Sequence, residues 1–269
     1  MKRVAWMTDI HLEFINRQAL DAFLESAREQ NPEALLLTGD ICPAAGLRSA
    51  LLHMAERLAI PIYFVLGNHD FYGSDISLVR EDMTRLTRED RGAIWMPLAG
   101  VVELAPGIGL VGHDGWSDGR YGHFLKSPIS LNDYLFIASL KTPSREELLK
   151  HLHALGDEAA AYLRAVLAEA VQRFDRIYVL THPPPFMEAC WHDEKLPDED
   201  DVYLPHFTCK AIGDLLLACA SKHPRIEFTV LCGHTHGGGA AQIRDNLLVL
   251  TGQAEYGAPA VQRIFEFKV

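Results

Sequence analysis

The chain has 269 residues, 48% of them hydrophobic, so it can bury the core of one sizeable α/β domain or two small ones. Its formal net charge of −11, with no long basic tract, argues against a general binder of nucleic acids or anionic membranes. Five cysteines without C-x-x-C spacing are typical of reduced thiols. We see neither a signal peptide nor a membrane-spanning run at or after the N-terminus, and expect a cytoplasmic protein.

The first third of the chain alternates between predicted strands and predicted helices. Apolar runs at 2–8, 34–38 and 62–66 predict strands, and helical periodicity follows Asn16 and recurs over 47–58. This alternation predicts a mainly parallel sheet with helices packed on it. In such sheets ligands bind beyond the carboxyl ends of the strands.

The rest of the chain adds further predicted elements around two irregular segments. The predicted elements are helices at 74–91, 144–174 (which Gly156 could split) and 206–221, a hairpin at 101–111, and strands at 176–181, 228–232, 240–243, 247–251 and 261–267. Residues 113–143 form a long irregular stretch that we interpret as a lid or substrate loop, and 186–205 an acidic loop. No linker or repeat interrupts the chain, so we expect one domain over residues 1–269.

Metal-ligand side chains follow directly after five of the predicted strands. The five clusters are Asp9-x-His11, Gly39-Asp40, Gly67-Asn68-His69-Asp70, His182 and Gly233-His234-Thr235-His236. Taken one at a time, each cluster also fits turn residues or helix caps. Together they offer carboxylate, amide and imidazole donors without thiolate, a set that suits Mn, Fe, Zn or Ni. Seven donors exceed the needs of one ion and fit two ions that share a carboxylate.

This ordered set resembles the calcineurin-like metallophosphoesterase superfamily over nearly the whole chain, from Asp9 to His236. The resemblance implies an α/β fold with four αββα layers, in which helices flank two mixed β-sheets. It also implies two transition-metal ions, Mn or Fe in the first place and Zn or Ni as alternatives. Asp40 would bridge them. The first ion would be held by Asp9, His11, Asp40 and His236, and the second by Asp40, Asn68, His182 and His234.

The same resemblance gives catalytic roles to the next two residues of the third cluster. His69 would face the phosphate and protonate the leaving oxygen, and Asp70 would orient His69. Two cations about 3.5–4 Å apart would lower the pKa of a bridging water, and the resulting hydroxide would attack in line. The alternative for His69 is a hydrogen-bond donor that only supports the metal ligands.

A glycine-rich stretch from Gly112 to Arg120 also follows an apolar run. Asp114, Trp116 and Arg120 are candidate substrate contacts, because Arg120 could bind a phosphate oxygen and Trp116 could stack on a base. The alternative interpretation is a turn with solvated charges.

The blocks differ from those of protein Ser/Thr phosphatases. Ile41-Cys42-Pro43 follows Asp40, and the third cluster ends in Asp70 where those enzymes carry Glu. We therefore expect a phosphoesterase, a phosphodiesterase or phosphatase, that acts on a small phosphodiester or phosphomonoester. Long nucleic acid and membrane are not expected partners. The alternatives are a nuclease or nucleotide hydrolase that acts with a partner, and a non-catalytic scaffold of the same fold. The oligomeric state is not predicted.

Overall fold

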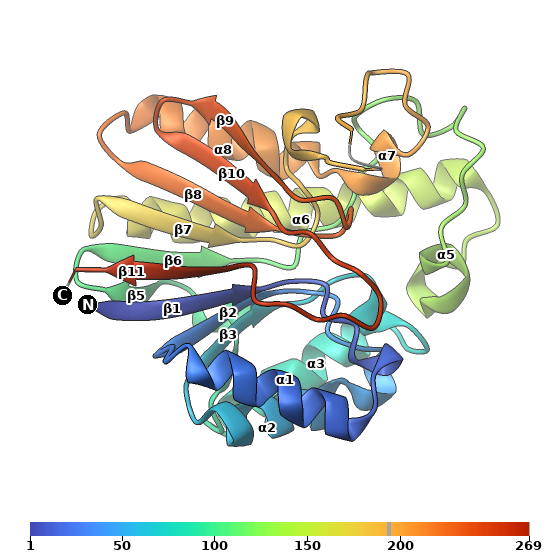
Figure 1. Cartoon of the computed structure of the whole chain (residues 1–269). Helices are drawn as coiled ribbons and strands as arrows, with labels where there is room; N and C mark the ends of the chain where they lie inside the picture. The colour runs from blue at the N-terminus through green and yellow to red at the C-terminus, as the bar shows by residue number, and fades with distance from the viewer. Residues whose placement is uncertain (193–194, 269) are drawn as a thin grey trace.

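Two mixed β-sheets lie face to face between two layers of helices (Figure 1). The computed structural model describes residues 1–192 and 195–268. The first sheet has the order β11-β1-β2-β3-β4, formed by Arg263–Phe267, Lys2–Met7, Ala34–Thr38, Ile62–Val65 and Ala93–Trp95. The second has the order β5-β6-β7-β8-β10-β9, formed by Val102–Ala105, Ile108–Gly112, Arg176–Leu180, Glu227–Cys232, Leu247–Thr251 and Gly239–Arg244. The four-layer αββα arrangement confirms the predicted fold class.

Three helices cover the first sheet and two cover the second (Figure 1). The first layer contains α1 (Arg17–Glu29), α2 (Ala44–Leu58) and α3 (Ile76–Arg88). The second contains α6 (Arg145–Ala170) and α8 (Lys210–Lys222), which pack on each other. Short helices and turns complete the chain: α4 (Met96–Ala99), α5 (Asp133–Phe136), α7 (Leu204–Phe207), η1 (Leu12–Phe14), η2 (His69–Phe71), η3 (Ala138–Leu140) and η4 (Met187–Ala189).

Alternation along the strands divides the core into three hydrophobic clusters, one for each interface between layers. In β1, Ala5 and Met7 belong to the cluster beneath α1–α3, whereas Val4 and Trp6 belong to the cluster between the two sheets. A third cluster lies between the second sheet and α6 and α8. Successive side chains of a strand point to opposite faces, so strands buried on both sides read as continuous apolar runs.

Most predicted elements are present, with boundary shifts of a few residues. The strands β1, β2 and β3 pair in parallel, as the alternating pattern predicts. Asn16 caps α1 by accepting a hydrogen bond from Ala19 N (2.9 Å), and Ser144 caps α6 by accepting one from Glu147 N (3.2 Å). The sequence did not predict β4, which has only three residues, and the predicted helix at 206–221 is two helices, α7 and α8.

The prediction that Gly156 could split the long helix is wrong. α6 runs unbroken from Arg145 to Ala170. A Cβ atom at residue 156 would lie 2.7 Å from the Cβ atom of Asp118. Gly156 therefore allows a loop to pack closely against the helix, which outweighs its low helix propensity.

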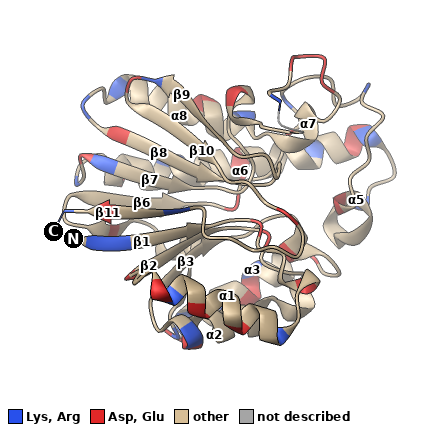
Figure 2. Cartoon of the chain, in the orientation of Figure 1, with Lys and Arg blue, Asp and Glu red and all other residues tan. Residues whose placement is uncertain are grey.

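The two predicted loops lie at the end of the sheets where the parallel strands finish (Figure 1). Residues 113–143 are irregular apart from α5 and η3. The predicted acidic loop at 186–205 includes residues 193 and 194, which lie outside the described residues. Charged residues of both signs are interspersed over the outer helices and loops (Figure 2). Among the described helices, none has the length and apolar character required to cross a lipid bilayer.

Candidate dinuclear metal site

The carboxyl ends of five strands meet at one end of the two sheets. Strands β1, β2, β3, β7 and β8 end just before Asp9, Asp40, Asn68, His182 and His234. Within each sheet these strands are parallel to one another, so their final residues lie at the same edge. The structure brings all seven predicted metal-ligating side chains together there, although they come from residues 9 to 236.

The first donor group consists of Asp9, His11, Asp40 and His236, whose ligand atoms all lie within 4.8 Å of one another. The Nε2 atoms of His11 and His236 are 3.1 Å apart. His11 Nε2 lies 3.7 Å from Asp40 Oδ2, and His236 Nε2 lies 3.6 Å from Asp9 Oδ1. Imidazole nitrogens and carboxylate oxygens facing one point are the donor set that a transition-metal cation takes.

The second donor group consists of Asp40, Asn68, His182 and His234. Asn68 Oδ1 lies 3.1 Å from His182 Nε2 and 2.9 Å from His234 Nδ1. His182 Nε2 lies 3.4 Å from Asp40 Oδ1. The two oxygens of Asp40 thus face different donor groups, Oδ2 the first and Oδ1 the second. This is the geometry expected of a carboxylate shared by two ions.

The backbone carries strain at the same positions. Five of the seven donors have a positive φ: Asp9 (48°), His11 (39°), Asp40 (51°), His234 (73°) and His236 (60°). Non-glycine residues adopt this conformation at a cost, and such outliers cluster at functional sites. Two glycines let the segments approach, because a Cβ atom at Gly67 would lie 2.2 Å from Asp40 Oδ1 and one at Gly233 would lie 1.9 Å from Asp9 Oδ2.

Hydrogen bonds aim the donors of the second group. His182 Nδ1 donates to Thr38 O (2.8 Å), which leaves Nε2 facing the site. His234 Nε2 donates to His206 O (3.1 Å), which leaves Nδ1 facing the site. Asn68 Nδ2 donates to Asp133 Oδ1 (2.8 Å), which turns the amide oxygen inward. Such outer partners orient metal ligands, so the residues present fit a dinuclear metal centre.

Asp133 is a site residue that sequence reasoning missed. It is buried at the start of α5, and its Oδ1 also accepts a hydrogen bond from Tyr72 Oη (2.7 Å). Burial raises the pKa of this carboxyl. It comes from the irregular segment 113–143, where no periodicity or spacing relates it to Asn68. Only the fold reveals the contact.

Glu13 is a second missed residue, two positions after His11. Its Oε1 lies 3.3 Å from His11 Nδ1 and 3.9 Å from His69 Nδ1. Burial alone would raise the pKa of Glu13, but its interactions with the two histidines outweigh burial and lower the pKa to about 2. The signal in the sequence that could have identified Glu13 was its position two residues after the predicted ligand His11.

His69 lines the cavity beside the two donor groups. Its ring stacks on Tyr72 (4.3 Å between centroids) and meets the ring of His11 edge-on (4.7 Å). Burial would lower the pKa of His69, but the negative charge of Asp40 and the nearby carboxylate of Glu13 raise it to about 9. Cations bound at Asp40 would reduce this effect, since they offset its charge.

The prediction that Asp70 orients His69 is wrong. Asp70 is fully buried and points the other way: its Oδ1 accepts hydrogen bonds from Ile41 N (2.7 Å) and Cys42 N (3.0 Å), and its Oδ2 accepts one from Gly67 N (2.8 Å). It joins the loop after β2 to the loop after β3. The carboxylate beside the His69 ring is Glu13.

The structure also contradicts the three predicted substrate contacts. Asp114 is buried and accepts hydrogen bonds from Leu66 N and Trp95 Nε1 (2.8 Å each), and it pairs with Arg80. Trp116 packs in the core. Arg120 is held by Asp118 (3.0 Å) and Asp157 (2.8 Å). None of the three lines the cavity of about 670 Å³ above the donors. Asp114 and Trp116 border only a void of about 10 Å³ beside Asn68.

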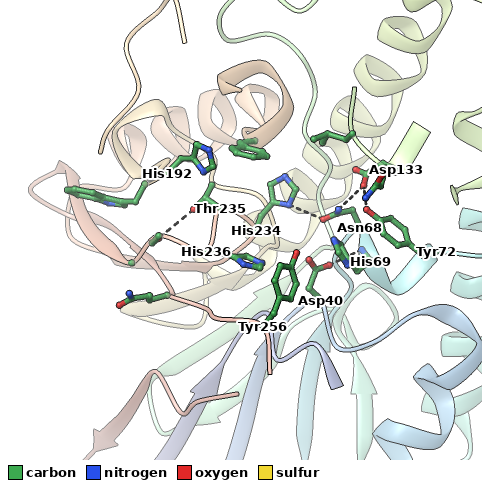
Figure 3. Close-up of a pocket in the computed structure, with 17 residues that line it drawn as sticks. Asp40, Asn68, His69, Tyr72, Asp133, His192, His234, Thr235, His236 and Tyr256 are labelled. Atoms are coloured by element: carbon green, nitrogen blue, oxygen red, sulfur yellow. Dashed lines mark hydrogen bonds between the residues drawn. The ribbon is translucent and has the colours of Figure 1, made fainter. Parts of the chain in front are cut away.

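A cavity of about 670 Å³ opens above Asp40, Asn68 and His69 (Figure 3). The predicted loop 113–143 contributes to its wall through Leu131, Asn132 and Asp133. The other lining residues are Tyr72, Trp191, His192, Phe207, His234, Thr235, His236, Gly237, Gly238, Gln253 and Tyr256.

Two curated proteins are similar to part of this chain in sequence. The bovine transmembrane protein with metallophosphoesterase domain is 30% identical over 127 residues, which cover 39% of this chain and 28% of that protein. The UDP-2,3-diacylglucosamine hydrolase of Stenotrophomonas maltophilia (strain K279a) is 32% identical over 92 residues, which cover 30% and 35%. The matched parts therefore span about a third of these relatives or less.

Two solved structures share the fold at 14% sequence identity. The phosphopantetheinyl hydrolase PptH of Mycobacterium tuberculosis superposes with a TM-score of 0.61 over 95% of this chain and 90% of that chain. A dimetal phosphatase of Danio rerio superposes with a TM-score of 0.55 over 94% and 87%. The profile of the family described as Calcineurin-like phosphoesterase matches residues 2–238. The chain therefore belongs to the calcineurin-like phosphoesterase family.

Proposed function

We propose that this protein hydrolyses a small phosphodiester or phosphomonoester, with two transition-metal ions bound to the seven donors. The observation that carries the proposal is Asp40, whose two carboxylate oxygens face the two donor groups. The mixed oxygen and nitrogen donors favour Mn or Fe, with Zn or Ni as alternatives. The net charge of −11 supports a small-molecule substrate in place of long nucleic acid. We place the protein in the cytoplasm because its five cysteines are free thiols.

Bound cations would activate a water molecule and offset the charge of the phosphoryl group. The protein's own residues would bind the ions and transfer protons. Asp40 would hold both ions, and Asn68 and His182 would fix the second. His69 lines the cavity and is placed to give a proton to the leaving oxygen, with its ring held between Tyr72 and His11.

A non-catalytic scaffold would tolerate loss of these donors. Each of the seven predicted positions carries a side chain that can bind a metal ion, and the backbone of five of these residues is in a strained conformation. Strain of this kind persists where function requires it. The intact donor set therefore supports a catalytic centre.

Metal content and turnover test the proposal together. We expect elemental analysis of the purified protein to give about two transition-metal ions per chain. A chelator should abolish hydrolysis of bis(p-nitrophenyl) phosphate, and added Mn²⁺ should restore it. Absence of bound metal, together with no turnover stimulated by Mn²⁺, would refute the proposal. A parallel assay of aryl monoesters, aryl diesters, cyclic nucleotides and an oligonucleotide would rank the substrates.

A further inference from the structure

The described lining of the cavity contains acidic side chains but neither lysine nor arginine. Asp40 and Asp133 lie on it directly. Glu13 stands behind His69, and Asp9 lies beside His236. The backbone of Lys195 forms hydrogen bonds with the backbone of the lining residue His192 (2.9 Å). The carboxylates would offset much of the positive charge that two divalent cations bring.

This charge balance discriminates between classes of phosphoester. The second pKa of a phosphomonoester is near 6, so a monoester carries about two negative charges at neutral pH, whereas a diester carries one. Sites that take the doubly charged group commonly provide an arginine fork or a lysine. Here the second charge would enter a cavity whose described lining includes two carboxylates and no arginine or lysine, which makes its binding less favourable.

The walls of the cavity are rich in aromatic rings. On the side of the first donor group, Tyr256 packs against His11 (4.6 Å between centroids) and Tyr72 against His69 (4.3 Å). Figure 3 shows Tyr256 beside Asp40 and His236. On the other side, Phe207 meets His234 edge-on (5.2 Å), and Trp191 also lines the cavity. Aromatic faces bind planar rings by stacking, whichever ring is presented.

We infer that the substrate is a phosphodiester with a single negative charge and at least one planar ring, such as an aryl or nucleoside ester. This inference rests on the proposed function and narrows it. In the reaction, the oxygen of water bonds to phosphorus and gives up one proton, the bond from phosphorus to the leaving oxygen breaks, and the leaving oxygen takes one proton, so water and diester become a monoester and an alcohol. The product is a monoester that ionises to a doubly charged group, so the same charge balance favours its release and protects it from a second hydrolysis.

Three substrates that share the same leaving group, p-nitrophenol, test the inference on the Mn²⁺-loaded protein. They are bis(p-nitrophenyl) phosphate, methyl p-nitrophenyl phosphate and p-nitrophenyl phosphate. We expect kcat/KM to be at least about tenfold higher for either diester than for the monoester, and higher for the ring-bearing diester than for the methyl diester. A monoester rate equal to or above the diester rates would overturn the inference and leave the proposed function standing. No turnover of any of the three by the metal-loaded protein would overturn both.

A substituted rim residue provides a second, independent test. Gln253 lines the cavity, is exposed, and forms hydrogen bonds to Gln262 only through its backbone. Gln253→Arg should raise the monoester-to-diester ratio of kcat/KM by about tenfold, because it supplies the missing cation. Gln253→Met, which stays neutral, should leave the ratio unchanged. An unchanged ratio in a folded Gln253→Arg variant would contradict the role assigned to charge.

Binding without turnover can be measured with a matched pair of phosphonates. Calorimetry should show that the singly charged methyl ester of phenylphosphonate binds the metal-loaded protein more tightly than doubly charged phenylphosphonate at alkaline pH. Tighter binding of the doubly charged compound would overturn the inference, whatever the kinetic result.

Discussion

The two donor groups share Asp40 but are built differently. In the second group, each of the other three donors is aimed by a hydrogen bond to a fixed acceptor: His182 to Thr38 O, His234 to His206 O, and Asn68 to Asp133. In the first group, His236 packs against the ring of Tyr256, and its side chain is 25% exposed. Its partner His11 faces Glu13, whose side chain is 23% exposed. The difference indicates a second group in which every donor is aimed by a hydrogen bond and a first group in which His236 is held by ring packing.

This difference has a physical consequence for metal binding. A ligand that is already aimed loses little conformational freedom when a cation binds, so the second group should bind its ion more tightly. Besides the shared Asp40, all three donors of the first group have a positive φ (Asp9, His11 and His236), whereas His234 is the one such donor in the second. We therefore expect two-step metal binding, with the first donor group filled last and emptied first.

Asp40→Asn should have the largest effect, because it removes the charge that both groups share. We expect both ions to be lost or weakly held and the rate to fall by at least about 10²-fold. Mutation of a residue that only orients a metal ligand already lowers metal affinity or activity by about 10–100-fold. Elemental analysis and the diester assay check this. The matched control is Asp245→Asn, in the exposed turn between β9 and β10. Two ions at full occupancy in Asp40→Asn would rule out the bridge.

His69→Ala should separate chemistry from metal binding. His69 lines the cavity but belongs to neither donor group, so both ions should stay bound. We expect a loss of about 10²-fold on esters with poor leaving groups and a smaller loss on p-nitrophenyl esters, because only a poor leaving group needs the proton. Equal losses on both kinds of ester would contradict the role of His69 as a proton donor.

The contrast between the groups also explains what the sequence could predict. Donors that directly follow apolar strands were predictable, because parallel strands bring their carboxyl ends to one edge. Asp133 was not, because it lies in an irregular segment and reaches Asn68 only through the tertiary fold. Glu13 left only the weak signal of its proximity to His11. The sequence predicts ligands better than the residues that aim them.

The incorrect predictions have a related cause. Asp70, Asp114 and Arg120 are polar residues near predicted strand ends, and a pattern cannot tell which way such a side chain points. Asp70 turns inward to bind three backbone amides, and Asp114 turns inward to bind Trp95 and Arg80. Buried carboxylates of this kind stabilise loops because their oxygens satisfy buried donors.

Asp133→Ala should weaken the second group selectively. Without the carboxylate, the Asn68 amide is free to turn, and we expect the affinity of the tighter ion to fall about 10–100-fold. The buried hydroxyl of Tyr72 also loses its acceptor, which should cost about 1–3 kcal/mol of unfolding free energy. Mn²⁺ titration by calorimetry should show the two binding steps merging. Asp133→Asn, which keeps an oxygen acceptor, should restore part of the separation, and equal weakening of both steps would contradict the assignment.

Glu13→Gln should produce the smallest change and confine it to the first group. The substitution keeps the shape of the side chain but removes the negative charge beside His11 Nδ1, which makes the His11 ring a poorer donor to a cation. We expect the weaker of the two Mn²⁺ affinities to fall by up to about tenfold while the tighter one stays unchanged. Because Glu13 also lies near His69, the rate on poor leaving groups should fall slightly with saturating Mn²⁺. If only the higher of the two Mn²⁺ affinities fell, the first donor group would be the tighter site and the expected order of binding would be reversed, since His11 of the first group is the donor that Glu13 contacts.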